Sequence, residues 1–440
     1  MKFPIVFVTS GPAPQAEFSM TQRPGKPPTT AKWAFTARFR SRAFGWRGSD
    51  LAARRLKEAV GEIRRAAKAD PLRAGAGAVS LLERLWPALQ DIDTSSGHLG
   101  RAVYDTIDAL IPIIANAPAD RPTRGKWLER LFDAIQQDGV DYLSMVADRW
   151  GEIAVYPELL TKYADDFIPL LDRVWTEGRP GEHVRGAAIC LSALLASGRD
   201  DELFRLLAYP TRKAWHYHQF GAEALARKGL PDAAIAYAEA CRDGYSDRGI
   251  DGFCERILIA AGRPDEAYDR YGIHQGLRST YLATYRALTD RYPDRDPRSI
   301  LQDLITAYDE PGKWFAAAKD AGFLDLAIVC ARSYDADPVT LARASRDFAT
   351  RQPAFALETG LLAVDGILRG RGRDPTSIDL NMALDAVMAA ASAANYSDWA
   401  MGQIQRLGSL AAAPGREHLQ GLLRYRFGPI EHAPSQRIES

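Results

Sequence analysis

The sequence predicts an all-α protein, an α-solenoid of helix-turn-helix repeats that follows an N-terminal helical region. Ala and Leu are abundant in the 440-residue chain, whereas runs of Val, Ile and Thr bounded by turns are nearly absent, which favours helix over strand. Apolar residues recur at helical spacing along most of the chain. A short pattern that combines a helix end, a glycine turn and a helix start occurs twice between Gly221 and Ile273.

The repeated pattern has a mechanical reason at each position. Its two copies are Leu225-x-x-x-Gly229-x-Pro231-Asp232-x-Ala234 and Leu258-x-x-x-Gly262-x-Pro264-Asp265-x-Ala267. The glycine can take positive φ, which ends the first helix at little cost. The proline suits the first position of the next helix, and the aspartate favours that helix N-terminus electrostatically. The small alanine lets the two helices approach closely.

Weaker copies of the same turn are centred on Gly198, Gly322 and Asn395. Consecutive turn positions, from 198 through 229, 262 and 322 to 395, are separated by 31, 33, 60 and 73 residues. Because helix-pair repeats of the tetratricopeptide type run at roughly 34 residues, the chain resembles a degenerate relative of that family, although the aromatic positions match poorly. An ordinary helical bundle that reuses one kind of turn is the alternative.

The remaining elements are expected in the following order. Residues 1–31 are rich in Pro, Thr and Gly and are expected to form a disordered leader, in which Met1 and Met20 are alternative starts. The N-terminal helical region is residues 32–180, the repeats are residues 181–427 and a flexible tail is residues 428–440. Two helices are predicted at Leu51–Ala69, capped by Ser49 and Asp50, and from Pro71 to Leu89. A third is predicted from His98 to Ala115, capped by the loop Asp91–Gly97. Four more are predicted at Trp127–Gln137, Tyr142–Trp150, Glu158–Tyr163 and Phe167–Trp175. Gly75, Gly77, Gly370 and Gly372 are expected in turns.

Four segments resemble a proteobacterial all-helical family that is catalogued only as a domain of unknown function. They are Phe39-Arg-Ser-Arg-Ala-Phe-Gly-Trp46, Ala69-Asp-Pro71, Asp91-Ile-Asp-Thr-Ser-Ser-Gly97 and Gly221-Ala-Glu-Ala-Leu225. The resemblance covers most of residues 38–410, and none of its motifs is diagnostic alone. It implies a bacterial cytoplasmic protein and no particular activity.

Cysteine usage and hydropathy favour a cytoplasmic protein. The four cysteines are 51, 13 and 76 residues apart in helical, apolar contexts, which predicts buried free thiols rather than a zinc site. The most apolar stretch, Ala109–Ala117, is too short to span a bilayer and contains a proline. The first residues resemble a secretory signal only faintly, because the apolar run is short and includes Pro4.

Positive charge is concentrated near the N-terminus, although the chain as a whole has no net charge. Residues 23–73 contain fourteen Lys and Arg against four Asp and Glu. Within residues 32–47, Arg38, Arg40, Arg42 and Arg47 alternate with aromatic side chains, a pattern that suits contact with a nucleic-acid backbone and its bases. The alternatives are a membrane-surface segment, an organelle transit peptide, or docking of Phe39, Phe44 and Trp46 on the helical body while the arginines pair with its acidic surface.

Two further clusters are candidates for a site. The segment from Trp215 to Phe220 is the densest aromatic and histidine cluster, and core packing competes there with a role in lining a groove. The predicted groove-lining residues are Trp215, Tyr217, His218, Tyr237 and Tyr268. The acidic residues Asp138, Asp141, Asp148 and Glu152 form the second cluster, and paired carboxylates there suit a divalent metal or acid/base catalysis, unless they form a solvated helix face.

The predicted function is that of a non-catalytic cytoplasmic scaffold or adaptor that binds a protein or peptide in the solenoid groove. The sequence contains no Walker loop, G-x-G-x-x-G, G-x-S-x-G or H-E-x-x-H motif, so nothing in it calls for a cofactor or a specific enzyme class. Stacked helix pairs leave extended surfaces that typically bind proteins or peptides. A nucleic-acid-associated regulator that uses residues 32–47 and a metal-dependent enzyme that uses residues 138–152 are the alternatives.

Overall fold

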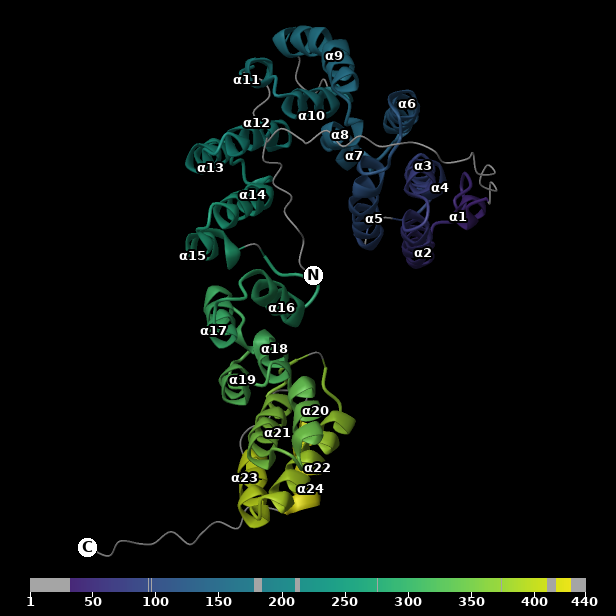
Figure 1. Cartoon of the computed structure of the whole chain (residues 1–440). Helices are drawn as coiled ribbons and strands as arrows, with labels where there is room; N and C mark the ends of the chain where they lie inside the picture. The colour runs from purple at the N-terminus through teal and green to yellow at the C-terminus, as the bar shows by residue number, and fades with distance from the viewer. Residues whose placement is uncertain are drawn as a thin grey trace, which may run out of the picture. The chain divides into compact units, whose positions relative to one another are not determined.

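The computed structural model describes residues 32–428, except 94, 96, 178–183, 210–213, 275, 373 and 410–416. In this part of the chain all regular structure is helical, and no strand occurs (Figure 1). The all-α prediction is therefore confirmed. The predicted leader (residues 1–31), the predicted tail beyond Gly428 and the predicted boundary between residues 180 and 181 lie outside the described residues.

The chain divides into two compact units. The first unit comprises Met1–Asp166 and Ala188–Ser197, and the second comprises Phe167–Ala187 and Gly198–Ser440. The helices that begin in the first unit, together with α10, are α1 (Ala34–Arg38), α2 (Ser49–Ala67), α3 (Pro71–Leu82), α4 (Leu85–Leu89), α5 (His98–Ala115), α6 (Arg121–Gln137), α7 (Ser144–Asp148), α8 (Trp150–Ala154), α9 (Pro157–Glu177) and α10 (Ala187–Ser197).

In the first unit, helices α2, α3 and α5 pack on one another, with α6 against α3 and α8 against α5. Gly75 and Gly77 lie inside α3, so the expectation that they form turns is wrong. A Cβ atom at Gly75 would lie 2.7 Å from the ring of Trp127, and one at Gly77 would lie 2.4 Å from the ring of Trp33. These glycines let two indole rings lie directly on the helix backbone.

Several predicted helix boundaries in the first unit differ from the structure. The hydroxyl of Ser49 does not cap α2; it donates a hydrogen bond to the Asp93 carbonyl oxygen at 2.8 Å. Helix α5 follows Gly97, which has φ of 68° and makes no side-chain cap; Thr94 and Ser96 of the loop that was expected to cap this helix lie outside the described residues. The helix predicted at Tyr142–Trp150 is the two short helices α7 and α8, and two helices predicted between Glu158 and Trp175 are one, α9, with Pro169 inside it.

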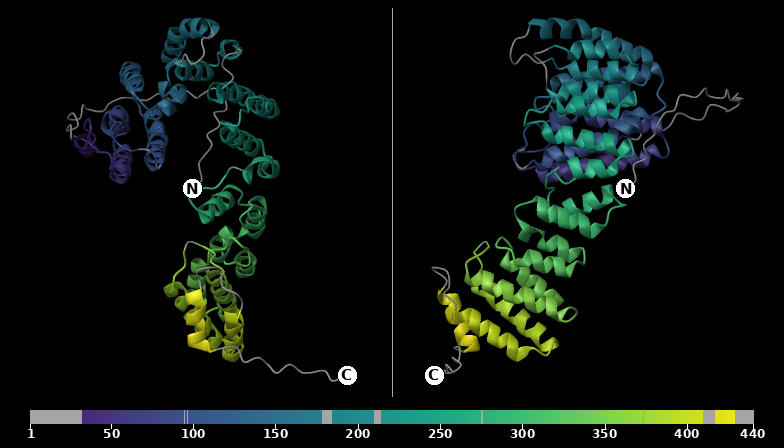
Figure 2. Two further views of the ribbon diagram at one scale, coloured as in Figure 1. Left: turned by 180° about the vertical axis from the view of Figure 1, so that it is seen from behind. Right: turned by 90° about the vertical axis from the view of Figure 1, so that its left-hand side faces the viewer.

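The second unit is a succession of helices, most of which pack on helices close to them in the sequence (Figures 1 and 2). Its helices after α9 are α11 (Asp200–Leu207), α12 (Trp215–Arg227), α13 (Pro231–Glu239), α14 (Asp247–Ala260), α15 (Pro264–Ala267), the π-helical turn η1 (Tyr268–Gly272), α16 (Tyr281–Arg291), α17 (Pro297–Ala307), the 3₁₀ turn η2 (Pro311–Trp314), α18 (Phe315–Asp320), α19 (Leu324–Ala331), α20 (Pro338–Phe348), α21 (Pro353–Leu368), α22 (Ser377–Ala393), α23 (Ser397–Ser409) and α24 (Glu417–Phe427). One continuous cluster of buried apolar residues extends from Trp215 to Leu423.

The predicted turn positions have the predicted backbone conformation. The φ angle is positive at all five of them: Gly198 (70°), Gly229 (74°), Gly262 (74°), Gly322 (87°) and Asn395 (60°). After the last four, the next N–H donates to the carbonyl five residues earlier, as in the bond from Leu230 to Leu225. The residue five positions after each turn is fully buried: Leu203, Ala234, Ala267, Ala327 and Ala400. The local turn predictions are confirmed.

Two further predictions concern the cysteines and the membrane. All four cysteines, Cys190, Cys241, Cys254 and Cys330, are buried and free, as predicted. Of the helices that the structure describes, none is both long and apolar enough to cross a membrane.

Candidate functional site

The aromatic residues predicted to line a groove lie in the packed interior of the second unit. Trp215 and Tyr217 are buried, with their rings against Phe253 and Trp175 at centroid distances of 5.3 and 5.4 Å. Tyr268, in the π-helical turn η1, is almost fully buried and donates a hydrogen bond to Asp303 at 2.8 Å. These rings stabilise the contacts between successive helices.

The predicted histidine site is a buried pair. The Nδ1 atom of His218 lies 2.6 Å from the hydroxyl oxygen of Tyr237, and burial raises the pKa of that hydroxyl. His216 is exposed, two residues away on another face of α12. A direct contact of these five predicted residues with a partner stays a prediction, and the proposal below rests on residues that are more exposed.

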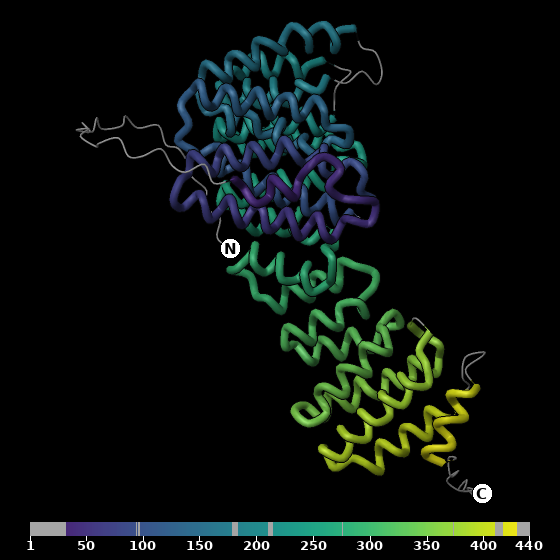
Figure 3. The backbone as a smooth tube through the Cα atoms, turned by 90° about the vertical axis from the view of Figure 1, so that its right-hand side faces the viewer, coloured from purple at the N-terminus to yellow at the C-terminus, as the bar shows by residue number. Residues whose placement is uncertain are grey.

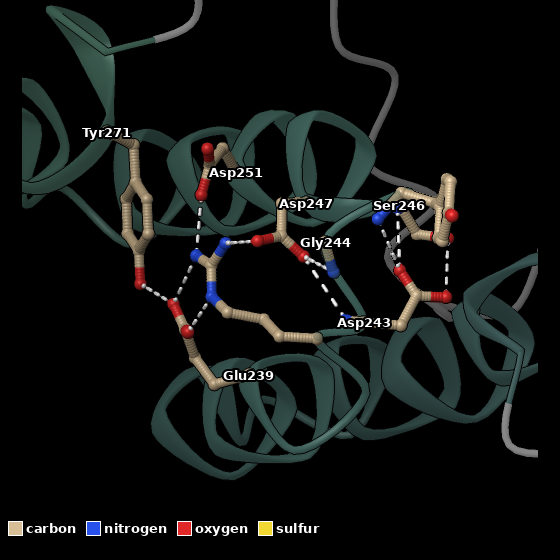
Figure 4. A network of polar contacts seen from close by, with 9 residues as sticks. Glu239, Asp243, Gly244, Ser246, Asp247, Asp251 and Tyr271 are labelled. Atoms are coloured by element: carbon tan, nitrogen blue, oxygen red, sulfur yellow. Dashed lines mark hydrogen bonds and ion pairs between the residues drawn. The ribbon is translucent and has the colours of Figure 1, made fainter.

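A network of charged side chains joins α13 to α14 (Figure 4). The guanidinium of Arg242 donates to Glu239 and to Asp251, both at 2.5 Å, and lies 3.7 Å from Asp247. Tyr271 donates to the same Glu239 carboxylate at 2.6 Å. The hydrogen bond from Arg242, with the one from Tyr271, holds the pKa of Glu239 below its ordinary value. Since the carboxylates are bonded within the protein, the network fixes the helix pair.

The four acidic residues between 138 and 152 have separate structural roles. Asp138 is buried and its carboxylate accepts the N–H groups of Val140 and Leu143, which holds the turn before α7. Asp141 is exposed with φ of 59°, and Glu152 is bound by Arg149 at 2.7 Å. Burial raises the pKa of Asp148, the last residue of α7, to about 7. Within the described ranges, no three His, Cys, Asp or Glu side chains form a group suited to a metal ion.

The segment of alternating arginines and aromatic residues, residues 32–47, packs in part against the rest of the protein. Phe39 and Phe44 are buried, in agreement with the docking alternative, whereas Trp46 is 68% exposed. The guanidinium of Arg38 donates to Glu58 at 2.6 Å, and that of Arg42 lies 3.8 Å from Asp91.

The other two arginines of the segment, Arg40 and Arg47, are exposed, and neither forms an ion pair within the described part of the chain. Two of the four arginines predicted to contact nucleic acid are therefore engaged inside the protein.

A cavity between two helices of the second unit is a candidate for a binding site. We call it the α21–α23 pocket, and its volume is about 530 Å³. It is lined by Ala354, Leu357, Glu358, Leu361, Leu362, Asp365, Arg369, Ala394, Tyr396, Trp399, Gln403, Arg406 and Leu407. On the α21 side the apolar lining residues are Ala354, Leu357, Leu361 and Leu362, which form an apolar floor.

Two aromatic residues, Tyr396 and Trp399, lie at the N-terminus of α23. Asn395 takes the left-handed conformation that ends α22, and the N–H of Tyr396 then donates to the Ala391 carbonyl oxygen at 2.8 Å. This turn places Tyr396 and Trp399 with centroids 6.4 Å apart in an edge-on arrangement. Their side chains are 58% and 50% exposed, respectively. Half-exposed, preordered aromatic rings beside an apolar floor are typical of anchor sites for a partner's side chain.

The charges around the pocket are nearly all compensated. Glu358 is bound by Arg332 at 2.5 Å, and Asp365 is bound by Arg369 at 2.7 Å. Arg406 is exposed and forms no ion pair in the part of the chain that the structure describes. The pocket therefore combines an apolar floor and aromatic wall with one uncompensated positive charge at its edge.

The α21–α23 pocket has no distinctive signature in the sequence. Its floor consists of leucines and alanines at ordinary helical spacing, and nothing in that pattern distinguishes a floor from a core. The signal that could have found it is the turn pattern at Ala391, Asn395 and Ala400, because Tyr396 and Trp399 occupy the exposed positions between the last two residues.

No protein-family model matches this chain, and a search of curated proteins finds no match. The resemblances to tetratricopeptide repeats and to the proteobacterial helical family therefore stay predictions.

Proposed function

We propose that this protein is a non-catalytic scaffold or adaptor whose second unit binds a protein or peptide partner in the α21–α23 pocket. The observation that carries the proposal is the pair of half-exposed rings, Tyr396 and Trp399, held over an apolar cavity of about 530 Å³. A cavity of this size accommodates one or two large side chains and is mostly apolar, as ligand pockets are.

The same proposal includes the architecture of the second unit, a solenoid of helix pairs similar to tetratricopeptide repeats. Positive φ at the five turn positions supports it, as do the buried small residues that follow four of these turns. In a solenoid each pair contacts mainly its neighbours, which leaves long surfaces for recognition. The buried free thiols suit the reducing cytoplasm in which we place the protein.

The partner segment is expected to carry a large apolar side chain with a carboxylate nearby. The apolar group would fill the space between α21 and the rings of Tyr396 and Trp399. The carboxylate would pair with Arg406, the charge that has no partner of its own within the described residues. Charge at the rim sets the orientation of a partner, while buried aromatic anchors supply most of the binding energy.

Selection of displayed random dodecapeptides on the immobilised full chain tests this proposal. We expect enrichment of peptides with a large apolar residue beside Asp or Glu. Their affinity should fall about 30-fold on Trp399→Ala, since truncation of an anchor residue typically costs 2 kcal/mol or more. The control is Tyr425→Ala, which removes an almost fully exposed ring on α24, outside the pocket.

Peptides that bind the wild type, Tyr425→Ala and Trp399→Ala equally well would refute the pocket as the site. Failure to select any peptide above background would refute the proposal as a whole.

A further inference from the structure

Helix α2 of the first unit carries an exposed row of cations that the functions discussed above do not use. The row consists of Arg54, Lys57, Arg64, Arg65 and the C-cap residue Lys68, all of them exposed. We call this row the α2 basic face. At 100° of rotation per residue the five positions fall within about 100° of arc, and with 1.5 Å of rise per residue they extend over about 21 Å.

The opposite side of α2 is fixed in the protein interior. Leu56, Ala59, Val60 and Ile63 are buried there, and α2 packs on α1, α3 and α5. Helix α2 lies at an edge of its unit, so its other side faces outward (Figures 1 and 3). Gly61 lies in the middle of the basic face, where a Cβ atom would meet only the Arg65 guanidinium at 3.5 Å. A ligand can therefore approach the helix backbone between the cations.

Two of the three acidic residues of α2, Glu58 and Glu62, are bonded to the segment before it. Glu58 accepts from Arg38 at 2.6 Å and from Arg55 at 2.8 Å. Glu62 accepts the backbone N–H groups of Ala34 and Phe35 at 2.8 and 3.3 Å, which holds the start of α1. Docking of the N-terminal segment thus uses the carboxylates that would otherwise neutralise the face.

The five cations of the face have no ion-pair partner within the described ranges. Arg54 lies close enough to Glu58 to act on it through its charge, but Glu58 is already bonded to Arg38 and Arg55. Asp50 lies on the same side of the helix, one turn before Arg54, and its carboxylate is 3.6 Å from His98. Basic residues in a last turn also stabilise a helix through its dipole, which accounts for Arg64, Arg65 and Lys68 but not for Arg54 and Lys57.

We infer that the α2 basic face binds the sugar-phosphate backbone of a nucleic acid, independently of its sequence. A row of uncompensated cations about 21 Å long matches a line of phosphates, which are the main source of affinity for such proteins. A membrane is the less suitable polyanion, because helices that bind at a bilayer surface bury their apolar face in lipid. The apolar face of α2 is in the core, and the exposed Trp46 and Leu51 both precede the first cation, Arg54.

Fluorescence anisotropy with a labelled 20-nucleotide oligothymidylate and a labelled 20-base-pair duplex tests the inference on the full chain. Five phosphate contacts predict that the affinity for the single strand falls about 100-fold between 50 and 200 mM salt. In the triple variant Lys57→Gln, Arg64→Gln, Arg65→Gln, two contacts remain, so the same change of salt should lower the affinity only about 7-fold. Binding at 50 mM salt should also be at least tenfold weaker.

The control is the triple variant Arg286→Gln, Arg343→Gln, Arg424→Gln, which changes the net charge equally at exposed positions of the second unit. It should bind as the wild type does. Equal losses in the two triple variants, or no binding of either oligonucleotide at 50 mM salt, would overturn the inference. So would binding to vesicles that contain phosphatidylserine without binding to oligonucleotides. Because the face and the α21–α23 pocket lie on different units, failure of the peptide selection does not affect this result.

Discussion

The buried carboxyl group of Asp148 is expected to make the protein less stable as the pH rises. Its pKa lies at about 7 in the folded chain because burial disfavours the charged form, compared with 3.8 for a solvated aspartate. The folded state therefore binds more protons than the unfolded state between these two values. The free energy of unfolding should fall as the pH increases from about 4 to about 7 and should not change further on this account above pH 8.

The size of the effect follows from the shift. A rise of about three pKa units corresponds to roughly 4 kcal/mol between the acidic and neutral limits, since each unit is 1.36 kcal/mol. The variant Asp148→Asn keeps the shape of the neutral side chain and cannot ionise. It should be more stable than the wild type by only about 1 kcal/mol at pH 4.5 and by roughly 4 kcal/mol at pH 8. The latter is about 10 °C in the melting temperature of a unit of this size.

Melting of the wild type and Asp148→Asn by circular dichroism at pH 4.5, 5.5, 6.5 and 8 measures this difference. Subtraction of the two curves removes the contributions of all other titrating groups. The control Asp141→Asn makes the same change of charge at an exposed position of the same segment, so its difference should vary little with pH. A difference for Asp148→Asn that is flat with pH, or a variant that is less stable at pH 8, would refute the argument.

Three further predictions concern the second unit. Gly229→Ala should lower the free energy of unfolding by about 1 kcal/mol, because its φ is 74°, whereas Gly402→Ala, in open space on α23, should raise it slightly; urea unfolding distinguishes the two signs. Glu255→Gln should cost about 3 kcal/mol because it removes the buried carboxylate that accepts hydrogen bonds from Arg291 and Tyr292. Asp325→Asn, in an exposed pair, should have little effect in the same assay. Burial raises the pKa of Cys254 to about 11, so iodoacetamide at pH 8 should label it only after unfolding; labelling of the folded chain, seen by mass spectrometry, would contradict this.

The turns were predictable because their chemistry is local. Gly229, Gly262 and Asn395 end helices through their own backbone freedom, and the N–H that follows each one donates to a carbonyl only five residues away. No distant contact is needed to specify such a turn. The prediction of turns at Gly75 and Gly77 was wrong, because the requirement for glycine there comes from the rings of Trp127 and Trp33. A contact with a residue about fifty positions away leaves no local signature.

The acidic segment shows a second limit of the sequence. The spacing of Asp138, Asp141, Asp148 and Glu152 is compatible with one solvated helix face. In the structure Asp141 has positive φ and precedes α7, and the helix is interrupted between α7 and α8. Whether a carboxylate at helical spacing faces water, an arginine or the core depends on packing partners that the segment itself does not contain. The pKa of Asp148 is a consequence of that packing.

The excess of positive charge that the sequence shows in residues 23–73 is divided in the structure between residues 32–47 and helix α2. Residues 32–47 have the densest alternation of arginine and aromatic side chains, yet an extended or turning segment sends adjacent side chains in different directions. Two of its arginines, Arg38 and Arg42, form ion pairs with Glu58 and Asp91. On a helix, by contrast, positions 3, 7, 10 or 14 residues apart come to one side, so the cations of α2 combine although they are scattered in the sequence. The N-terminal segment then acts on this surface indirectly, because it bonds to Glu58 and Glu62 and so leaves the five cations of α2 without an ion-pair partner among the described residues.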